Sequence, residues 1–233
     1  MIGFYDYTVI LTYLSLLSAS TGIVVSLSGQ GHPYFGAFFL LFCGLCDAFD
    51  GKVARTKENR SEMECHFGIQ IDSLSDLVAF GVLPACIGVA LIHTSPFLHA
   101  ALPTEARLWY CLAGKFVFYA VLVLYILAAM IRLAYFNVTE EERQRTETGA
   151  RTYYTGLPVT SAALIFPFVL LMQYLLPTDI TLVYIAVVVL TSLAFLCRFQ
   201  IRKPGLRGIL IMVGIGLLEC IALLIYLKFK HLH

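Results

Sequence analysis

The sequence predicts an all-α fold, a polytopic membrane helix bundle with about seven transmembrane helices. Of its 233 residues, 59% are hydrophobic and only 13% are charged, whereas a soluble domain averages about 25% charged residues. The mean hydropathy is +0.82. The apolar residues gather in stretches close to the roughly 20 residues that a helix needs to cross a bilayer. We therefore expect a multi-pass protein of the cell membrane, in contact with membrane lipids.

Each predicted span follows from one apolar stretch. The stretches are residues 7–28, 34–50, 69–92, 109–136, 157–176, 180–197 and 207–227. The first is too long for the core of a cleavable signal peptide and lacks a basic flank, so it is expected to remain as the first span. No internal repeat or linker divides the chain, and residues 1–233 are expected to form a single integral-membrane domain.

Lysine and arginine residues set the expected orientation. They gather in residues 52–60, 132–151 and 198–207, and each of these segments carries four of the 16 basic residues. With seven spans, all three lie on one side of the membrane, which the positive-inside rule assigns to the cytoplasm. The net charge of only +1 gives no reason to expect a nucleic-acid partner.

Four of the six aspartates fall within one 30-residue stretch. Asp47, Asp50, Asp72 and Asp76 form the pattern D-x-x-D-G-x-x-A-R, twelve residues, and then G-x-x-x-D-x-x-x-D. Spacings of three and four place each pair on one helix face, so two adjacent helices would bring four carboxylates together. Carboxylates are costly in an apolar environment unless paired, and Mg²⁺, Mn²⁺ and Ca²⁺ prefer oxygen ligands. The pattern predicts a divalent-metal site; a polar network or exposed carboxylates without a ligand is the alternative.

Small residues accompany the aspartates. Gly51 and Ala54 follow the first pair, and Gly68 lies one helical turn before Asp72. Such positions let a ligand approach the helix closely. Arg55, one turn beyond Gly51, can reach a phosphate or a neighbouring carboxylate. These residues favour a pyrophosphate bridged by cations, in a site that brackets loop 51–68 and opens at the cytoplasmic surface.

The stretch from Asp47 to Asp76 resembles the signature of the CDP-alcohol phosphotransferases, although twelve residues separate Arg55 from Gly68 where eight are common. Three further runs are similar to those of bacterial CDP-diacylglycerol–serine O-phosphatidyltransferases (phosphatidylserine synthases). They are F-G-I-Q-I-D-S-L-S-D-L-V-A-F-G-V-L-P-A at 67–85, R-L-A-Y-F-N-V at 132–138 and T-G-L-P-V at 155–159. In the first span, Ser15 stands where relatives often carry asparagine.

The resemblance implies a six-helix family core plus one helix, and a homodimer. It implies transfer of the phosphatidyl group of CDP-diacylglycerol to the hydroxyl of L-serine, with release of CMP. Asp76 would be the catalytic general base. Two Mg²⁺ or Mn²⁺ ions would be held by Asp47, Asp50, Asp72 and Asp76. The CDP and phosphate groups would contact Asp47, Gly51, Ala54, Arg55, Gly68 and Ser15.

The acceptor pocket needs a cation for the carboxylate of serine. Arg132, with Tyr135 and Asn137 one turn on, is the first candidate, and Arg151 is the second. The alternative for Arg132 is a snorkelling anchor at the membrane interface. Glu219 lies in the middle of the last span and is expected to bond a neighbouring helix or subunit.

Three other functions share some of these features. An enzyme that uses glycerol 3-phosphate or inositol as the acceptor would have the same acidic motif. A membrane prenyltransferase also binds Mg²⁺-pyrophosphate through aspartates, but on two distant helices. An ion transporter would carry acidic residues near mid-span in two matching halves. The consecutive helices, the A-R pair and the position of the aspartates at helix ends favour the phosphotransferase.

Overall fold

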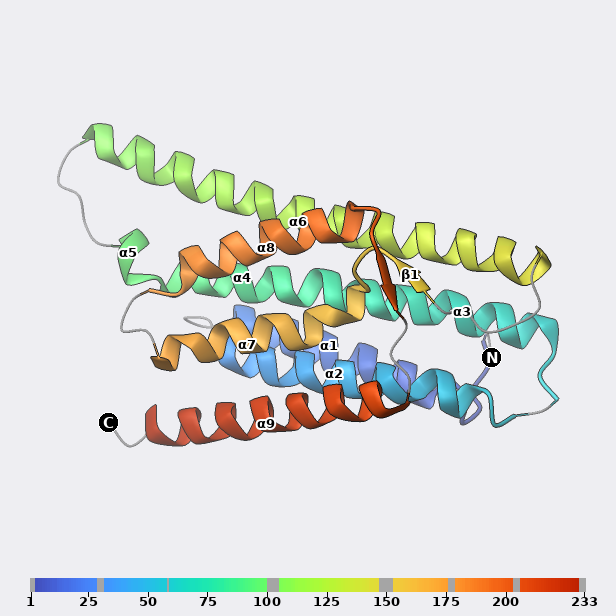
Figure 1. Ribbon diagram of the computed structural model, residues 1–233. Helices are drawn as coiled ribbons and strands as arrows, with labels where there is room; N and C mark the ends of the chain where they lie inside the picture. The colour runs from blue at the N-terminus through green and yellow to red at the C-terminus, as the bar shows by residue number, and fades with distance from the viewer. Residues whose placement is uncertain are drawn as a thin grey trace.

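The structure is a computed structural model that describes residues 3–28, 32–57, 59–99, 105–146, 153–175, 179–202 and 206–230. Within these residues, seven helical rods run side by side (Figure 1). The rods are α1 (Ile10–Leu27), α2 (Pro33–Ala54), the continuous α3 (Glu62–Asp76), η1 (Leu77–Val82) and α4 (Leu83–Thr94), α6 (Glu105–Thr146), α7 (Ala162–Leu175), α8 (Thr181–Leu196) and α9 (Leu206–Lys230). The short elements are α5 (Pro96–His99), β1 (Tyr153–Thr155), η2 (Val159–Ser161) and β2 (Gln200–Arg202).

The rods follow the apolar stretches of the sequence, which confirms the predicted all-α polytopic fold. Four helical segments are long and apolar enough to cross a membrane: Ile10–Leu27, Glu62–Thr94, Gly114–Arg143 and Gly208–Ile225. Shorter apolar helices cover Val159–Gln173 and Thr181–Leu196. Large apolar side chains such as Leu17, Val24 and Leu218 point outward. That surface suits the hydrocarbon of a bilayer.

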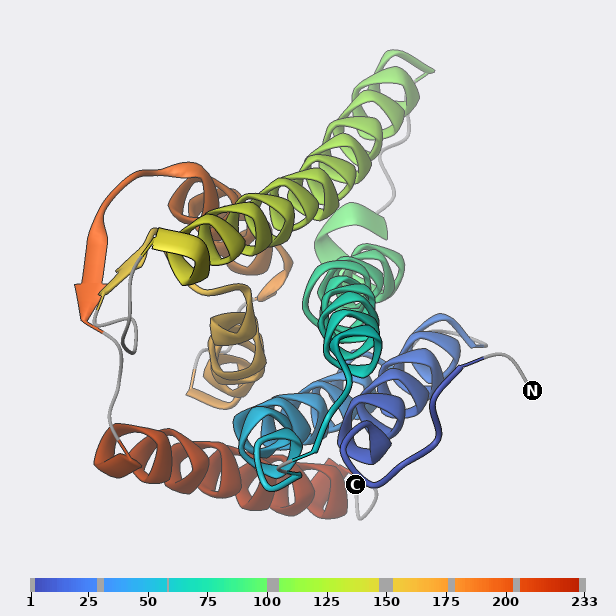
Figure 2. The same cartoon turned by 90° about the vertical axis from the view of Figure 1, so that its right-hand side faces the viewer.

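Helix α2 lies at the centre of the packing. It contacts α1 along its length and also α4, α7 and α9, while α6 packs on α8 and on η1 (Figure 2). The N-terminus, the end of α2, the start of α3 and the last turns of α6 lie toward the same end of the bundle (Figure 1). Lys52 in the last turn of α2 and Arg143 and Arg145 in the last turn of α6 therefore lie toward one end.

Two helices extend further than the apolar stretches predicted. Helix α2 continues to Ala54, and α3 begins at Glu62. A capping box starts α3: the Glu64 amide donates to Ser61 Oγ (3.2 Å), and the Ser61 amide donates to Glu64 Oε2 (2.8 Å). The connection between the two aspartate pairs is therefore shorter than residues 51–68.

Helix α6 also extends beyond its apolar stretch, which ended at residue 136, because it continues to Thr146. Arg143 pairs with Glu140 and Arg145 with Glu141, each at 2.6 Å. Pairs at these spacings stabilise an exposed helix by a few tenths of a kcal/mol each. The charged residues beyond the apolar stretch thus support a helix.

A small antiparallel pair of strands joins two distant connections at this end of the bundle. Tyr153, Tyr154 and Thr155 of β1 lie opposite Arg202, Ile201 and Gln200 of β2. Gly156 follows β1 with φ of +76°, and its amide donates to the Phe199 carbonyl (2.6 Å). A Cβ there would lie 2.9 Å from the Cys197 carbonyl oxygen. Only glycine fits both requirements.

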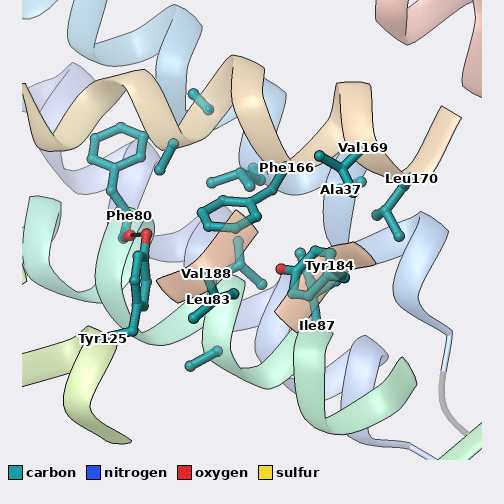
Figure 3. Packing of buried hydrophobic residues seen from close by; sticks show 14 of the residues in the cluster. Ala37, Phe80, Leu83, Ile87, Tyr125, Phe166, Val169, Leu170, Tyr184 and Val188 are labelled. Carbon is teal, nitrogen blue, oxygen red and sulfur yellow. Dashed lines mark hydrogen bonds between the residues drawn. The ribbon is translucent and has the colours of Figure 1, made fainter. Parts of the chain in front are cut away.

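The apolar core lies between α2, α4, α6, α7 and α8 (Figure 3). Phe166 of α7 packs edge-on against Tyr125 of α6, with ring centroids 5.5 Å apart. Its ring is tilted against that of Tyr184 of α8, with centroids 5.1 Å apart. Both tyrosine hydroxyls donate to carbonyls of the third rod: Tyr125 to Phe80 (2.6 Å) and Tyr184 to Pro84 (2.7 Å). The core thus fixes the rod that carries Asp72 and Asp76.

Candidate functional site

The structure brings the four motif aspartates together from α2 and α3. The side chains of Asp50 and Asp72 lie close enough to interact directly. Asp47 interacts electrostatically with Asp72, and Asp76 with all three others. Asp76 is buried, with 8% of its surface exposed, while the other three are half-buried. Carboxylates gathered in this way repel one another unless they share a proton or bind a cation.

No described basic side chain balances this negative charge. The ion pairs in the described part of the chain join Lys57 to Asp6 and Glu64, and two arginines of α6 to nearby glutamates. None of these pairs involves a motif aspartate. Four hard oxygen donors without a cationic neighbour fit a divalent cation. In the described residues, no three His, Cys, Asp or Glu side chains already have the geometry of a metal site, so side-chain rotation would accompany binding.

Hydrogen bonds with two other helices hold the part of α3 between its two aspartates. Ser75 Oγ donates to the Thr12 carbonyl of α1 (3.2 Å). Asn137 Nδ2 of α6 donates to Ser73 Oγ (2.6 Å), next to Asp72. These bonds fix the face that α3 turns toward α2.

The small motif positions lie beside arginine side chains. A Cβ at Gly51 would be 3.8 Å from Arg55 Nη2, and a Cβ at Gly68 would be 2.7 Å from Arg60 Nη2. Arg55 is exposed at the end of α2, next to Ala54. The absence of a side chain at Gly68 therefore makes room for Arg60.

Sequence analysis did not single out Arg60. Its Nη2 donates to the Glu64 carbonyl (3.2 Å), whereas its Nε is buried without a hydrogen-bond partner among the described residues. The guanidinium lies beside Gly68, one helical turn before Asp72 on α3, and among the described residues it forms no ion pair with a motif aspartate. A basic residue inside the lengthened gap between Arg55 and Gly68 was the signal for it.

The α1 candidate, Ser15, faces α2. Its side chain is buried, and its Oγ has no partner in the described part of the structure. The Cys43 thiol, one turn before Asp47, donates to the Ser15 carbonyl (3.3 Å). Ser18 Oγ instead donates to the Phe39 carbonyl (3.1 Å). Of these two serines, only Ser15 keeps a hydroxyl that can bind a ligand.

The candidate residues for binding the acceptor differ in burial and in hydrogen-bond partners. Arg132 is only 5% exposed, and its Nε donates to the Leu157 carbonyl (3.1 Å) beside Gly156. A snorkelling anchor would keep its guanidinium in water, so that alternative is wrong. Tyr135 is 43% exposed, Asn137 binds Ser73, and Arg151 lies outside the described residues.

Glu219 and Lys57 are two further ionisable residues outside the aspartate motif. Glu219 is buried on α9, which packs on α2 and α7, and its Oε2 has no hydrogen-bond partner among the described residues. Near the aspartates, Lys57 Nζ binds Asp6 (2.6 Å) and Glu64 (2.8 Å). The Lys57 hydrogen bond is the main reason that the pKa of Asp6 falls to about 2. This ion pair ties the N-terminal residues to the α2–α3 connection.

The family profile and the relatives found by comparison with known proteins agree with one another. The sequence profile of the CDP-alcohol phosphatidyltransferase family matches residues 8–217. The chain is 33% identical over 163 residues to a CDP-diacylglycerol–serine O-phosphatidyltransferase of Saccharomyces cerevisiae, covering 66% of this chain and 50% of that protein. It is 33% identical over 151 residues to an archaetidylserine synthase of Methanothermobacter thermautotrophicus, covering 64% and 52%. A CDP-diacylglycerol–serine O-phosphatidyltransferase of Helicobacter pylori is 26% identical over 202 residues, 84% of this chain and 73% of that protein. The chain thus spans about half the length of the first two relatives.

Proposed function

We propose, from the premise that this chain belongs to the CDP-alcohol phosphatidyltransferase family, that it transfers the phosphatidyl group of CDP-diacylglycerol to the hydroxyl of L-serine. The products would be phosphatidylserine and CMP. The convergence of four aspartates from α2 and α3 carries the proposal. The names of all three relatives include serine, whereas only two of them include CDP-diacylglycerol. Serine as the acceptor is therefore the shared element.

Asp47, Asp50, Asp72 and Asp76 would hold two Mg²⁺ or Mn²⁺ ions. When bound, such ions neutralise pyrophosphate charge and polarise the phosphorus that is attacked. The carboxylates supply only oxygen donors, which suits these cations and not softer metals. Bound cations would thus compensate the charge of carboxylates that lie within a membrane helix bundle.

Asp76 would act as the general base. It is the most buried of the four carboxylates, and it lies where α3 passes into the core. Its carboxylate would accept the proton of the serine hydroxyl as that oxygen forms a bond to phosphorus. The bond from phosphorus to the CMP oxygen breaks in the same displacement.

Arg55 and Arg60 would contact the phosphates of the donor. They lie beside Gly51 and Gly68, on the two helices that carry the aspartates. Gly51, Gly68 and Ala54 leave room for the pyrophosphate next to these guanidinium groups. Ser15 would contact the CDP through the hydroxyl that has no partner in the described structure.

Arg132 would bind the serine carboxylate near the Gly156 turn. Its contact with Leu157 orients the guanidinium. Tyr135, Asn137 and Arg151 are the other acceptor candidates, and Asn137 already contacts α3 through Ser73. We place the site on the cytoplasmic side of the cell membrane and expect one domain and a homodimer.

Release of CMP by the purified protein tests this function. With CDP-diacylglycerol and Mn²⁺ or Mg²⁺, L-serine should support turnover, whereas glycerol 3-phosphate and myo-inositol should not. Asp47→Asn, which removes one charge without changing side-chain size, is the matched inactive control. Equal turnover with glycerol 3-phosphate would refute serine as the acceptor, and no CMP release with any alcohol would refute the phosphotransferase itself.

A further inference from the structure

A π-helical turn lies directly after Asp76. Residues Leu77–Val82 form this turn between α3 and α4, and the Leu83 amide donates to the Val78 carbonyl, five residues back. A π-turn holds one residue more than an α-helical turn, and each α-helical residue turns by about 100°. The turn therefore sets the rotation of α3 relative to α4.

Proline contributes to the irregular hydrogen bonding here. Pro84 lies in the first turn of α4 and has no amide hydrogen to donate to the Phe80 carbonyl, four residues back. Tyr125 of α6 donates its hydroxyl to that carbonyl at 2.6 Å (Figure 3). Both residues are completely buried. This hydroxyl therefore satisfies a carbonyl that Pro84 cannot.

Helix α6 contacts the same turn at a second position. A Cβ at Gly81 would lie 3.3 Å from Ala129 Cβ, one turn beyond Tyr125 on α6, and 3.2 Å from Leu77 Cδ1. The Tyr125 ring is itself held by Phe166 and Phe195, with centroids 5.5 and 5.7 Å away. Three helices thus fix the position of the Tyr125 hydroxyl.

We propose that Tyr125 is a positioning residue that locks the π-turn and so directs Asp72 and Asp76 toward Asp47 and Asp50. Helix α4 is fixed by its own buried side chains. If the turn relaxed to an α-helix, α3 would rotate by about 100° about its axis and carry its carboxylates away from α2. This inference rests on the proposed role of the four aspartates as metal ligands.

Tyr125→Phe tests the proposal because it removes the hydroxyl and keeps the ring. Tyr184→Phe is the matched control: Tyr184 is equally buried and donates to the Pro84 carbonyl (2.7 Å), beyond the turn. Electron paramagnetic resonance would measure Mn²⁺ binding to the detergent-purified protein without substrate. CMP release would give kcat and the Mn²⁺ concentration for half-maximal rate, and thermal unfolding would report stability.

Tyr125→Phe should weaken Mn²⁺ binding and lower kcat, each by about tenfold, as expected when a buried carbonyl loses its partner. Tyr184→Phe should lower the unfolding temperature similarly and leave Mn²⁺ binding unchanged. Unaltered Mn²⁺ binding in Tyr125→Phe, or equal losses in both variants, would overturn the positioning role. If Tyr125→Phe does not fold, Gly81→Ala decides, since its Cβ presses on Leu77 and Ala129; unchanged Mn²⁺ binding there also overturns the proposal. A wild-type protein that binds no Mn²⁺ would instead refute the metal site of the proposed function.

Discussion

Replacing Gly68 by alanine should weaken binding of the donor lipid by displacing Arg60, with little effect on folding. The new Cβ would lie 2.7 Å from Arg60 Nη2. An unstrained contact needs about 3.5 Å, so the guanidinium must retreat by about 0.8 Å. The 3.2 Å hydrogen bond from Nη2 to the Glu64 carbonyl would lengthen or break. The contact involves the far end of a flexible side chain, so the helices need not move.

The expected change in stability is smaller than the expected loss of donor binding. Loss of the partly buried hydrogen bond destabilises the protein slightly. Alanine in a helix interior is more favourable than glycine by about 1 kcal/mol, which offsets that loss. The free energy of unfolding should therefore change by less than about 1 kcal/mol. A charged hydrogen bond to the donor phosphate contributes about 1.5–3 kcal/mol. Its loss corresponds to a rise in the KM for CDP-diacylglycerol of about tenfold to a hundredfold.

A double-mutant cycle identifies the cause. The KM for CDP-diacylglycerol would be measured in mixed micelles for Gly68→Ala, for Arg60→Ala and for the double variant, with thermal unfolding as the control for stability. In the Arg60→Ala background, the alanine at position 68 should add less than about 0.5 kcal/mol, because both changes remove the same contact. An equal effect with and without Arg60 would mean that the Cβ itself blocks the lipid. An unchanged KM in Arg60→Ala would refute the role of Arg60.

Three further predictions concern the base, the acceptor and the orientation. Asp76→Asn should reduce turnover by about 10²–10⁴-fold with only a modest loss of donor binding. Asp47→Ala should instead remove metal-dependent donor binding. A rate above about a tenth of wild type in Asp76→Asn would refute the assignment of Asp76 as the base. Arg132→Ala should cost about 1.5–3 kcal/mol in kcat/KM for serine and leave the KM for the lipid nearly unchanged; an unchanged serine KM would limit Arg132 to holding the Leu157 carbonyl. In a cysteine-free background, an impermeant reagent should label a cysteine at position 28 but not one at position 141 in intact cells, and the reverse result would invert the orientation.

The sequence was sufficient to predict the rods and the aspartate cluster. Apolar stretches of bilayer length leave few alternatives to helices, because a membrane span must satisfy its backbone hydrogen bonds internally. The spacings of three and four residues in the motif then determine which carboxylates share a face. Both predictions depend on local features, the length of an apolar stretch and the spacing of a motif, which a single sequence displays directly.

Features that depend on distant contacts could not be predicted in this way. The β1–β2 pair joins three-residue strands from two separate connections, and strands this short leave no periodic pattern. The π-turn arises where Pro84 and the Tyr125 hydroxyl act on one carbonyl, from rods that the sequence does not place together. The extension of α6 to Thr146 depended on charge pairs at helical spacing, such as Arg145 with Glu141, which a loop could also contain.

Helix α6 explains how the core and the proposed site are kept in register. With about 100° per residue, Tyr125, Ala129 and Arg132 lie within an arc of about 60° on one face. Along that face the contacts run from the π-turn, through Gly81, to the Leu157 carbonyl beside Gly156. A rotation of α6 would therefore disturb the rod that carries Asp72 and Asp76 and the proposed acceptor pocket together. Substitutions on this face should change metal affinity and serine KM jointly, whereas those on its lipid-facing side, such as Leu124, should change neither.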